Sequence, residues 1–161
     1  MVSMVPDFSF GILYENNNFL LVREGDIKRM DLYRRINLTG GSIRDDETPR
    51  EAIIRKFREE TGLYTRADKE PFYIRQGIKG DIKYNVFYFN CYRLGGKEQA
   101  GEGILEILFV PFESLISFKE SEDEFFIIVK NEYEKITPSL RALLRDMQKM
   151  NWKTFPYQIS R

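Results

Sequence analysis

The sequence predicts a mixed α/β domain, and three observations support that class. Apolar runs of strand length recur between the N-terminus and residue 110. Two segments, residues 48–62 and 139–150, carry apolar residues at helical spacing instead. The composition, 42% hydrophobic and 31% charged, is typical of a globular domain that buries a core. A chain of 161 residues is expected to form one domain over residues 1–161, with helices packed on strands.

The N-terminal quarter predicts a β-hairpin followed by a short strand. Residues 8–14 and 19–22 are apolar, and the three asparagines between them are a turn signal. Residues 25–35 are polar and basic and are expected to form a loop. Residues 36–38 predict a short strand that leads into a pair of glycines.

The next segment carries the signals of a capped helix. Thr48 is a natural N-cap, Pro49 occupies the first helical position, and Glu51 follows the cap by three residues. This arrangement is a capping box with proline at a favoured site. Gly62 is expected to end the helix. The apolar side of this helix consists of Ile53, Ile54 and Phe57. The opposite, charged side consists of Arg55, Lys56, Glu59 and Glu60.

Downstream segments predict further strands and two helices. The expected strands are residues 71–77, 82–92 and 104–110, with residues 94–103 as the loop between the last two. Aromatic residues alternate onto both faces of the middle strand, as expected when a strand is covered on both sides. Residues 111–115 are expected to start a short helix. Residues 139–150 carry a leucine-rich stripe at helical spacing and predict an amphipathic helix.

Charge and composition exclude several classes of partner. Lysine plus arginine and aspartate plus glutamate both number 25, so a nucleic-acid partner is not expected. No apolar run is long enough to span a bilayer, and the N-terminus lacks the pattern of a signal peptide. The single cysteine, Cys91, cannot form an internal disulfide and is interpreted as a small core residue. A reducing, cytoplasmic setting is the simplest expectation.

The absence of histidine limits the chemistry of the chain. It excludes Ser-His and Cys-His nucleophile pairs, histidine bases and histidine metal ligands. One cysteine also argues against a structural zinc site. Acid–base or metal chemistry must therefore use carboxylates, whose oxygens suit magnesium, manganese or calcium.

The glycine pair and the helix after it are the segment with the most functional information. The glycines allow a sharp bend and a close approach of the backbone to a ligand. The helix then holds adjacent carboxylates, whose repulsion a divalent cation would relieve. The alternative is a solvated helix face with Lys56–Glu60 and Arg55–Glu59 ion pairs.

The spacing of this segment resembles the signature of the Nudix hydrolase family, G-x5-E-x7-R-E-U-x-E-E-x-G-U, where U is a bulky apolar residue. The matching positions are Gly41, Glu47, Arg55, Phe57, Glu59, Glu60, Gly62 and Leu63. The one departure is Lys56, which stands where the family places a glutamate. The resemblance implies a Nudix-like α/β/α sandwich with a mixed β-sheet between helices.

The same resemblance implies an activity and a set of site residues. The activity is hydrolysis of the pyrophosphate of a nucleoside diphosphate linked to another group, such as a nucleotide sugar, an ADP-ribose-like molecule or a nucleoside triphosphate. The implied cofactor is Mg²⁺ or Mn²⁺. Its implied ligands are Glu59, Glu60 and Glu47. The implied catalytic residues are Arg55 and Glu59, joined by a carboxylate from a later loop, Glu98 or Glu102. The implied phosphate or substrate contacts are Gly40, Gly41, Arg23 and Arg35.

Lys56 leaves two functional hypotheses open. A protonated lysine cannot bind a divalent cation, and its ammonium could neutralise the neighbouring glutamates directly. The chain is then either a pyrophosphohydrolase whose other carboxylates compensate, or a weak or silent Nudix-like domain that binds a nucleotide or regulates. An RNA-binding relative is disfavoured by the neutral charge. A homodimer that uses aromatic residues after Met150 is a further expectation.

Overall fold

The computed structural model describes residues 6–150, which group into two compact units. The first unit contains residues 6–13 and 39–99, and the second contains residues 14–38 and 100–150. The mixed α/β class is confirmed. A single domain over residues 1–161 stays a prediction. Among the described residues, no helix has the length and apolar character needed to cross a membrane.

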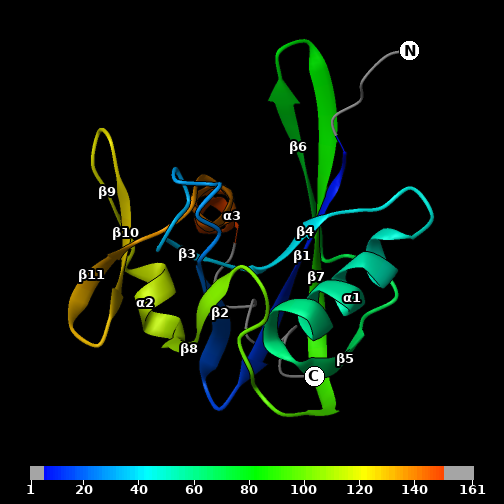
Figure 1. Ribbon diagram of the computed structural model, residues 1–161. Coiled ribbons are helices and arrows are strands. Elements are labelled where there is room, and N and C mark those ends of the chain that lie inside the picture. Colours follow the sequence, from blue (N-terminus) through cyan, green and yellow to red (C-terminus); the bar gives the residue numbers. More distant parts are fainter. Residues whose placement is uncertain (1–5, 151–161) are drawn as a thin grey trace. The chain divides into compact units, whose positions relative to one another are not determined.

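The first unit is a mixed sheet with one helix on it. Its elements are the first six residues of β1 (Phe8–Glu15), β4 (Thr39–Ser42), α1 (Pro49–Thr61), β5 (Leu63–Ala67), β6 (Tyr73–Lys79) and β7 (Ile82–Gly96). Strand β7 pairs in parallel with β1 and antiparallel with both β5 and β6, while β4 pairs antiparallel with β1. Figure 1 shows α1 beside β4 and β5, and β6 with β7 as a long ribbon.

Helix α1 forms as its local signals predict. The Thr48 side chain accepts a hydrogen bond from the backbone of Glu51, and Glu51 returns one to Thr48. Gly62 ends the helix in the left-handed conformation, with φ of 77°. The buried Phe57 lies against Gly11 of β1, where an added Cβ would come within 2.5 Å of the Phe57 ring. Gly11 therefore lets the helix approach the sheet closely.

Strand β7 is covered on both faces, as predicted. Four successive residues from Tyr88 to Cys91 are buried, so side chains on both faces are removed from solvent. Burial raises the pKa of the Cys91 thiol, consistent with a small core residue. The strand runs to Gly96, so the expected loop over residues 94–103 begins later than predicted. Strand β5 was not predicted. It is short and partly polar, and only three of its five residues are buried.

The second unit combines a small antiparallel sheet, a second three-stranded sheet and two helices. Its elements are the end of β1, β2 (Asn18–Glu24), β3 (Ile36–Asn37), β8 (Ile104–Pro111), α2 (Phe112–Ile116), β9 (Lys119–Glu120), β10 (Phe125–Val129), β11 (Glu132–Lys135) and α3 (Pro138–Lys149). Strand β2 pairs with β8, with β3 and with the end of β1, which confirms the N-terminal hairpin. Strands β9, β10 and β11 were not predicted, and they pair in the order β11-β10-β9.

Helix α3 is confirmed, and its start is fixed by a buried polar network. Thr137 caps the helix through the backbone of Leu140. The Asn37 side chain accepts hydrogen bonds from the hydroxyls of Thr137 and Ser139. The leucine stripe that the sequence indicates is buried. The C-terminal aromatics of the predicted dimer contact lie outside the described residues, so the homodimer stays a prediction.

Candidate functional site

The glycine turn of β4 lies against helix α1 in the first unit. Gly40 has φ of 153°, and a Cβ at this position would clash with the Ser9 carbonyl oxygen. Its backbone N–H donates to Glu60 Oε1 at 3.0 Å. The absence of side chains on Gly40 and Gly41 leaves room for helix side chains to reach the strand backbone. The turn and the helix therefore form one polar site.

Arg55 holds two carboxylates and the strand in fixed positions. Its Nη2 donates to Glu47 Oε1 at 2.6 Å, and its Nε donates to Glu47 Oε2 at 3.0 Å. Its Nη1 donates to Glu59 Oε1 at 2.7 Å, and Nη2 also reaches the Ser42 carbonyl oxygen at 3.1 Å. Bidentate contacts of this kind fix orientation as well as charge. Three residues of the predicted site, Glu47, Arg55 and Glu59, are thus brought together.

These contacts change the protonation behaviour of Glu47. The hydrogen bonds from Arg55 lower the pKa of Glu47 to about 2. Burial acts in the opposite direction, and the hydrogen bond from the Arg44 backbone N–H lowers this pKa further. The hydrogen bond to Glu47 likewise raises the pKa of Arg55. Glu47 is therefore ionised at neutral pH and is a weak proton acceptor, which suits a structural role better than a basic one.

Lys56 and Glu60 form a second pair that faces the glycine turn. The Lys56 ammonium lies 3.8 Å from Glu60 Oε2, and the two side chains are 22% and 11% exposed. The end of the Lys56 chain lies across Gly41, where an added Cβ would be 2.8 Å from Lys56 Cε. Glu60 was predicted on the charged helix face, and it is buried because it reaches the backbone of Gly40.

The residues present do not fit a divalent cation as they lie. Among residues 6–150, no three carboxylate, cysteine or histidine side chains are grouped closely enough to hold a metal ion. Glu47 and Glu59 are held by Arg55, and Glu60 is paired with Lys56. Magnesium and manganese need several oxygen ligands around one point. The assignment of Glu47, Glu59 and Glu60 as metal ligands stays a prediction, and their ion pairs with Arg55 and Lys56 argue against it.

The later carboxylates differ in their surroundings. Glu98 lies in the first unit and forms an ion pair with Arg93, with 2.7 Å between Oε1 and Nη1. The side-chain hydrogen bond from Arg93 lowers the pKa of Glu98, which weakens it as a base. Glu102 lies in the second unit, is exposed, and makes no hydrogen bond or ion pair with the described residues. Their predicted catalytic role stays a prediction.

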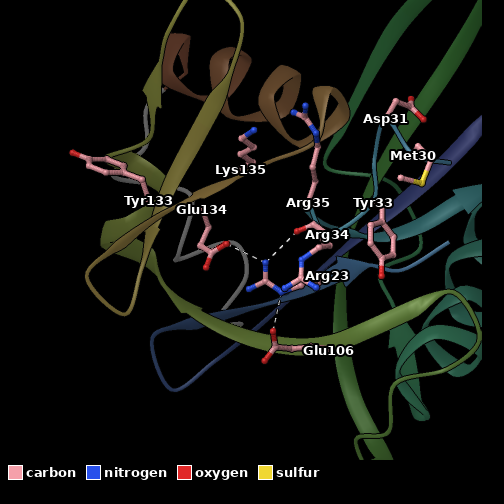
Figure 2. A pocket seen from close by; sticks show the side chains of 10 residues that line it. All are labelled: Arg23, Met30, Asp31, Tyr33, Arg34, Arg35, Glu106, Tyr133, Glu134 and Lys135. Carbon is pink, nitrogen blue, oxygen red and sulfur yellow. Dashed lines mark hydrogen bonds and ion pairs between the residues drawn. The ribbon is translucent and has the colours of Figure 1, made fainter. Parts of the chain in front are cut away.

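Arg23 and Arg35, the predicted phosphate contacts, line a cavity of about 520 Å³ in the second unit. Figure 2 shows Arg23 between two glutamates, and its guanidinium lies 2.9 Å from Glu106 and 3.0 Å from Glu134. Burial acts to lower the pKa of Arg23, but the hydrogen bonds to Glu134 and Glu106 outweigh it and raise that pKa. Arg35 is paired with Glu124 at 3.0 Å. Both arginines therefore already have anionic partners, and their contact with phosphate stays a prediction.

Two contributors to the site were not predicted from the sequence. Arg44 donates its backbone N–H to Glu47 and places its guanidinium 3.8 Å from Glu59. Ser42 contributes its carbonyl oxygen to Arg55. A contact made by a backbone atom cannot be recognised from the residue types of a sequence. The three-residue spacing of Arg44 and Glu47 was the one available signal, since it is typical of a turn closed by a side chain.

Comparison with known proteins places this site in a family. A family model of the NUDIX domain matches residues 6–128, about three quarters of the chain. No curated protein matches the sequence. Among solved structures, the fold is similar to a MutT protein from Methanosarcina mazei Go1, with a TM-score of 0.68, 16% identity, and coverage of 94% of this chain and 99% of that one.

Two further solved structures have the same fold, with similar TM-scores and sequence identities. The E. coli ORF135 protein has a TM-score of 0.66 and 16% identity, with 93% of each chain covered. A UDP-X diphosphatase has a TM-score of 0.62 and 18% identity, with 92% of this chain and 65% of that chain covered. The family match and the motif geometry agree. The chain therefore belongs to the NUDIX domain family, which supports its assignment as a Nudix-type pyrophosphohydrolase.

Proposed function

We propose that the domain hydrolyses the pyrophosphate of a nucleoside diphosphate linked to another group, at the glycine turn and helix α1. The observation that carries this proposal is the Arg55 arrangement, which holds Glu47, Glu59 and the Ser42 carbonyl in one fixed group. Positions of the family signature that are far apart in sequence meet there. A site whose charged groups are preorganised is what displacement at phosphorus requires.

The proposal gives the residues of the turn distinct roles. Gly40 and Gly41 let phosphate oxygens approach the backbone closely. Arg55 is a positioning residue, since it acts by holding Glu47 and Glu59. Glu59, whose side chain is 42% exposed, is the carboxylate of this group most open to a ligand. Glu98 would have to leave Arg93 before it could accept a proton.

The substrate class of the proposal rests on family membership and on one similar structure, which is a UDP-X diphosphatase. Nucleotide sugars, ADP-ribose-like molecules and nucleoside triphosphates all contain the required pyrophosphate. Mg²⁺ or Mn²⁺ is expected on the same ground, and Glu59 and Glu60 offer the oxygen donors that these ions prefer. A cation at this place would require Lys56 to turn away from Glu60.

A second candidate function is nucleotide binding with little or no hydrolysis. The Lys56–Glu60 pair favours it, because the lysine places a positive charge where the resemblance implies a ligand for the cation. Under this reading the domain keeps the architecture of the site and recognises a nucleotide as a sensor or regulator.

The test is product release from a panel of nucleoside diphosphate derivatives, with Mg²⁺ and with Mn²⁺. The full chain is compared with Glu59→Gln and Glu60→Gln, and with Glu132→Gln as a control on the exposed surface of the second unit. Hydrolysis predicts slow, metal-stimulated release that falls about tenfold or more in both site variants and is unchanged in the control. No release from any substrate, combined with nucleotide binding in equilibrium dialysis, would replace hydrolysis with the second candidate.

A further inference from the structure

The position of Lys56 has a consequence for the charge balance of the site. Among the described residues, ion pairs at the turn join Glu47, Glu59 and Glu60 to Arg44, Arg55 and Lys56. Three carboxylates therefore meet three cations, and these six ion-paired side chains carry no net charge without a metal ion. Bringing a divalent cation into a neutral group gains little from attraction and loses the hydration of the ion.

The Lys56 ammonium lies at the turn and is held there. Its aliphatic chain packs across Gly41, which has no side chain to exclude it. Its nitrogen lies at ion-pair distance from Glu60, whose other oxygen is held by the Gly40 backbone. The Lys56 side chain as a whole is 22% exposed, so it is mostly covered but not closed off from solvent.

Within residues 6–150, no hydrogen bond from the Lys56 ammonium is found, and its contact with Glu60 at 3.8 Å is an ion pair longer than a hydrogen bond. An ammonium carries three N–H donors. Lysine binds phosphate as a compact point charge, so these donors suit the oxygens of a pyrophosphate. The glycine backbone beside it leaves space for such a group.

We infer that Lys56 is a built-in cation that takes the place of a divalent metal at the glycine turn and binds pyrophosphate oxygens directly. This inference rests on the proposed function for the location of the phosphate. It differs from that proposal in making the first binding event independent of Mg²⁺ and Mn²⁺.

The charge balance also predicts how the site can be converted. Lys56→Glu would leave four carboxylates facing two cations, an excess of two negative charges that one divalent cation balances. The new carboxylate would lie one helical turn before Glu60, on the same face as Glu60. Lys56→Gln removes the positive charge without adding an anionic ligand. This variant therefore separates the loss of the ammonium from the gain of a carboxylate.

The first experiment measures Mn²⁺ binding to the full chain from the electron paramagnetic resonance signal of free Mn²⁺. The variants are Lys56→Glu, Lys56→Glu with Glu60→Gln, and Lys79→Glu as a matched charge reversal on the exposed face of β6. Lys56→Glu is expected to gain one site at least about tenfold tighter than any site of the unmodified chain. The added Glu60→Gln change should remove that site, and Lys79→Glu should not create one. Equal Mn²⁺ affinity of the unmodified chain and Lys56→Glu would overturn the inference.

The second experiment measures binding of inorganic pyrophosphate in excess EDTA by isothermal titration calorimetry. The unmodified chain is expected to bind, and Lys56→Gln to bind about tenfold or more weakly. Thermal unfolding followed by circular dichroism confirms that each variant is folded. Equal binding by Lys56→Gln, or no binding by the unmodified chain without metal, would overturn the inference. Neither readout uses turnover, so a failure of the hydrolase proposal is seen separately in the substrate panel.

Discussion

Replacing Glu47 with glutamine tests the Arg55 arrangement most cleanly, because the change removes one charge and keeps the shape. The Glu47 side chain is 11% exposed and accepts hydrogen bonds from the Arg55 guanidinium and from the Arg44 backbone. Its pKa is about 2, against an ordinary value of 4.5. That difference corresponds to about 3 kcal/mol. The pair is not fully buried, since 19% of the Arg55 side chain is exposed, so solvent screens part of this energy. We therefore expect about 2 kcal/mol of lost stability at neutral pH.

The pH dependence of this loss has a definite sign. A carboxyl whose pKa is lowered by folding stabilises the protein fully above its unfolded pKa. The contribution disappears as pH falls from 4.5 towards 2, because both states become protonated. Less than half of it is expected to remain near pH 3.

Urea unfolding of the full chain at about pH 7, 5, 4 and 3 measures the effect. The free energy of unfolding of Glu47→Gln should be about 2 kcal/mol lower than that of the unmodified chain at pH 7, and the gap should narrow in acid. Asp46→Asn is the control, since Asp46 is exposed in the same loop and forms no ion pair within the described residues. A gap that is the same at every pH, or no gap at pH 7, would show that the ionised Glu47 carboxylate does not stabilise the fold through Arg55.

Four further predictions concern the core of the first unit. The Thr39 hydroxyl is buried and has no hydrogen-bond partner within residues 6–150, so Thr39→Val should raise the free energy of unfolding by about 1 kcal/mol. A lower free energy in urea unfolding would contradict this. Thr61→Val should have the opposite effect and lower the free energy of unfolding by about 1–2 kcal/mol, because the Thr61 hydroxyl donates to the Phe57 carbonyl at 2.6 Å. Gly11→Ala should cost about 2 kcal/mol through its clash with the Phe57 ring, and an unchanged melting temperature would show that the ring moves freely. Cys91 should not react with a thiol reagent until the chain unfolds, and rapid labelling of the native chain would contradict its burial.

The elements that the sequence predicted well are those specified by neighbouring residues. Helix α1 begins at a capping box and ends at Gly62, and both signals lie within the segment itself. Strand β7 was predicted over residues 82–92 because aromatic residues alternate onto both of its faces, and it extends four residues further, to Gly96. Strands β9 and β11 are short and polar, and their pairing with β10 depends on contacts that no local pattern encodes.

The site was predictable as a set of residues, and its internal contacts were not. The spacing of Arg55 and Glu59 on one helix face was enough to predict their ion pair. The burial of Glu60 depends on Gly40, a residue twenty positions earlier on another element. The partners of Arg23 are more distant still, since Glu106 and Glu134 come from other strands of the second unit. Contacts over such separations are fixed by the fold and not by the residues beside them in sequence.

At the glycine turn, Lys56 is proposed to fill the role of the divalent cation. The most direct test is the Mn²⁺-dependent hydrolysis of a nucleotide sugar by Lys56→Glu and by the unmodified chain, measured side by side. If Lys56 fills this role, turnover by Lys56→Glu should be at least about tenfold faster than that of the unmodified chain, and it should stop in EDTA. Fast Mn²⁺-dependent turnover by the unmodified chain, reduced by Lys56→Glu, would contradict it.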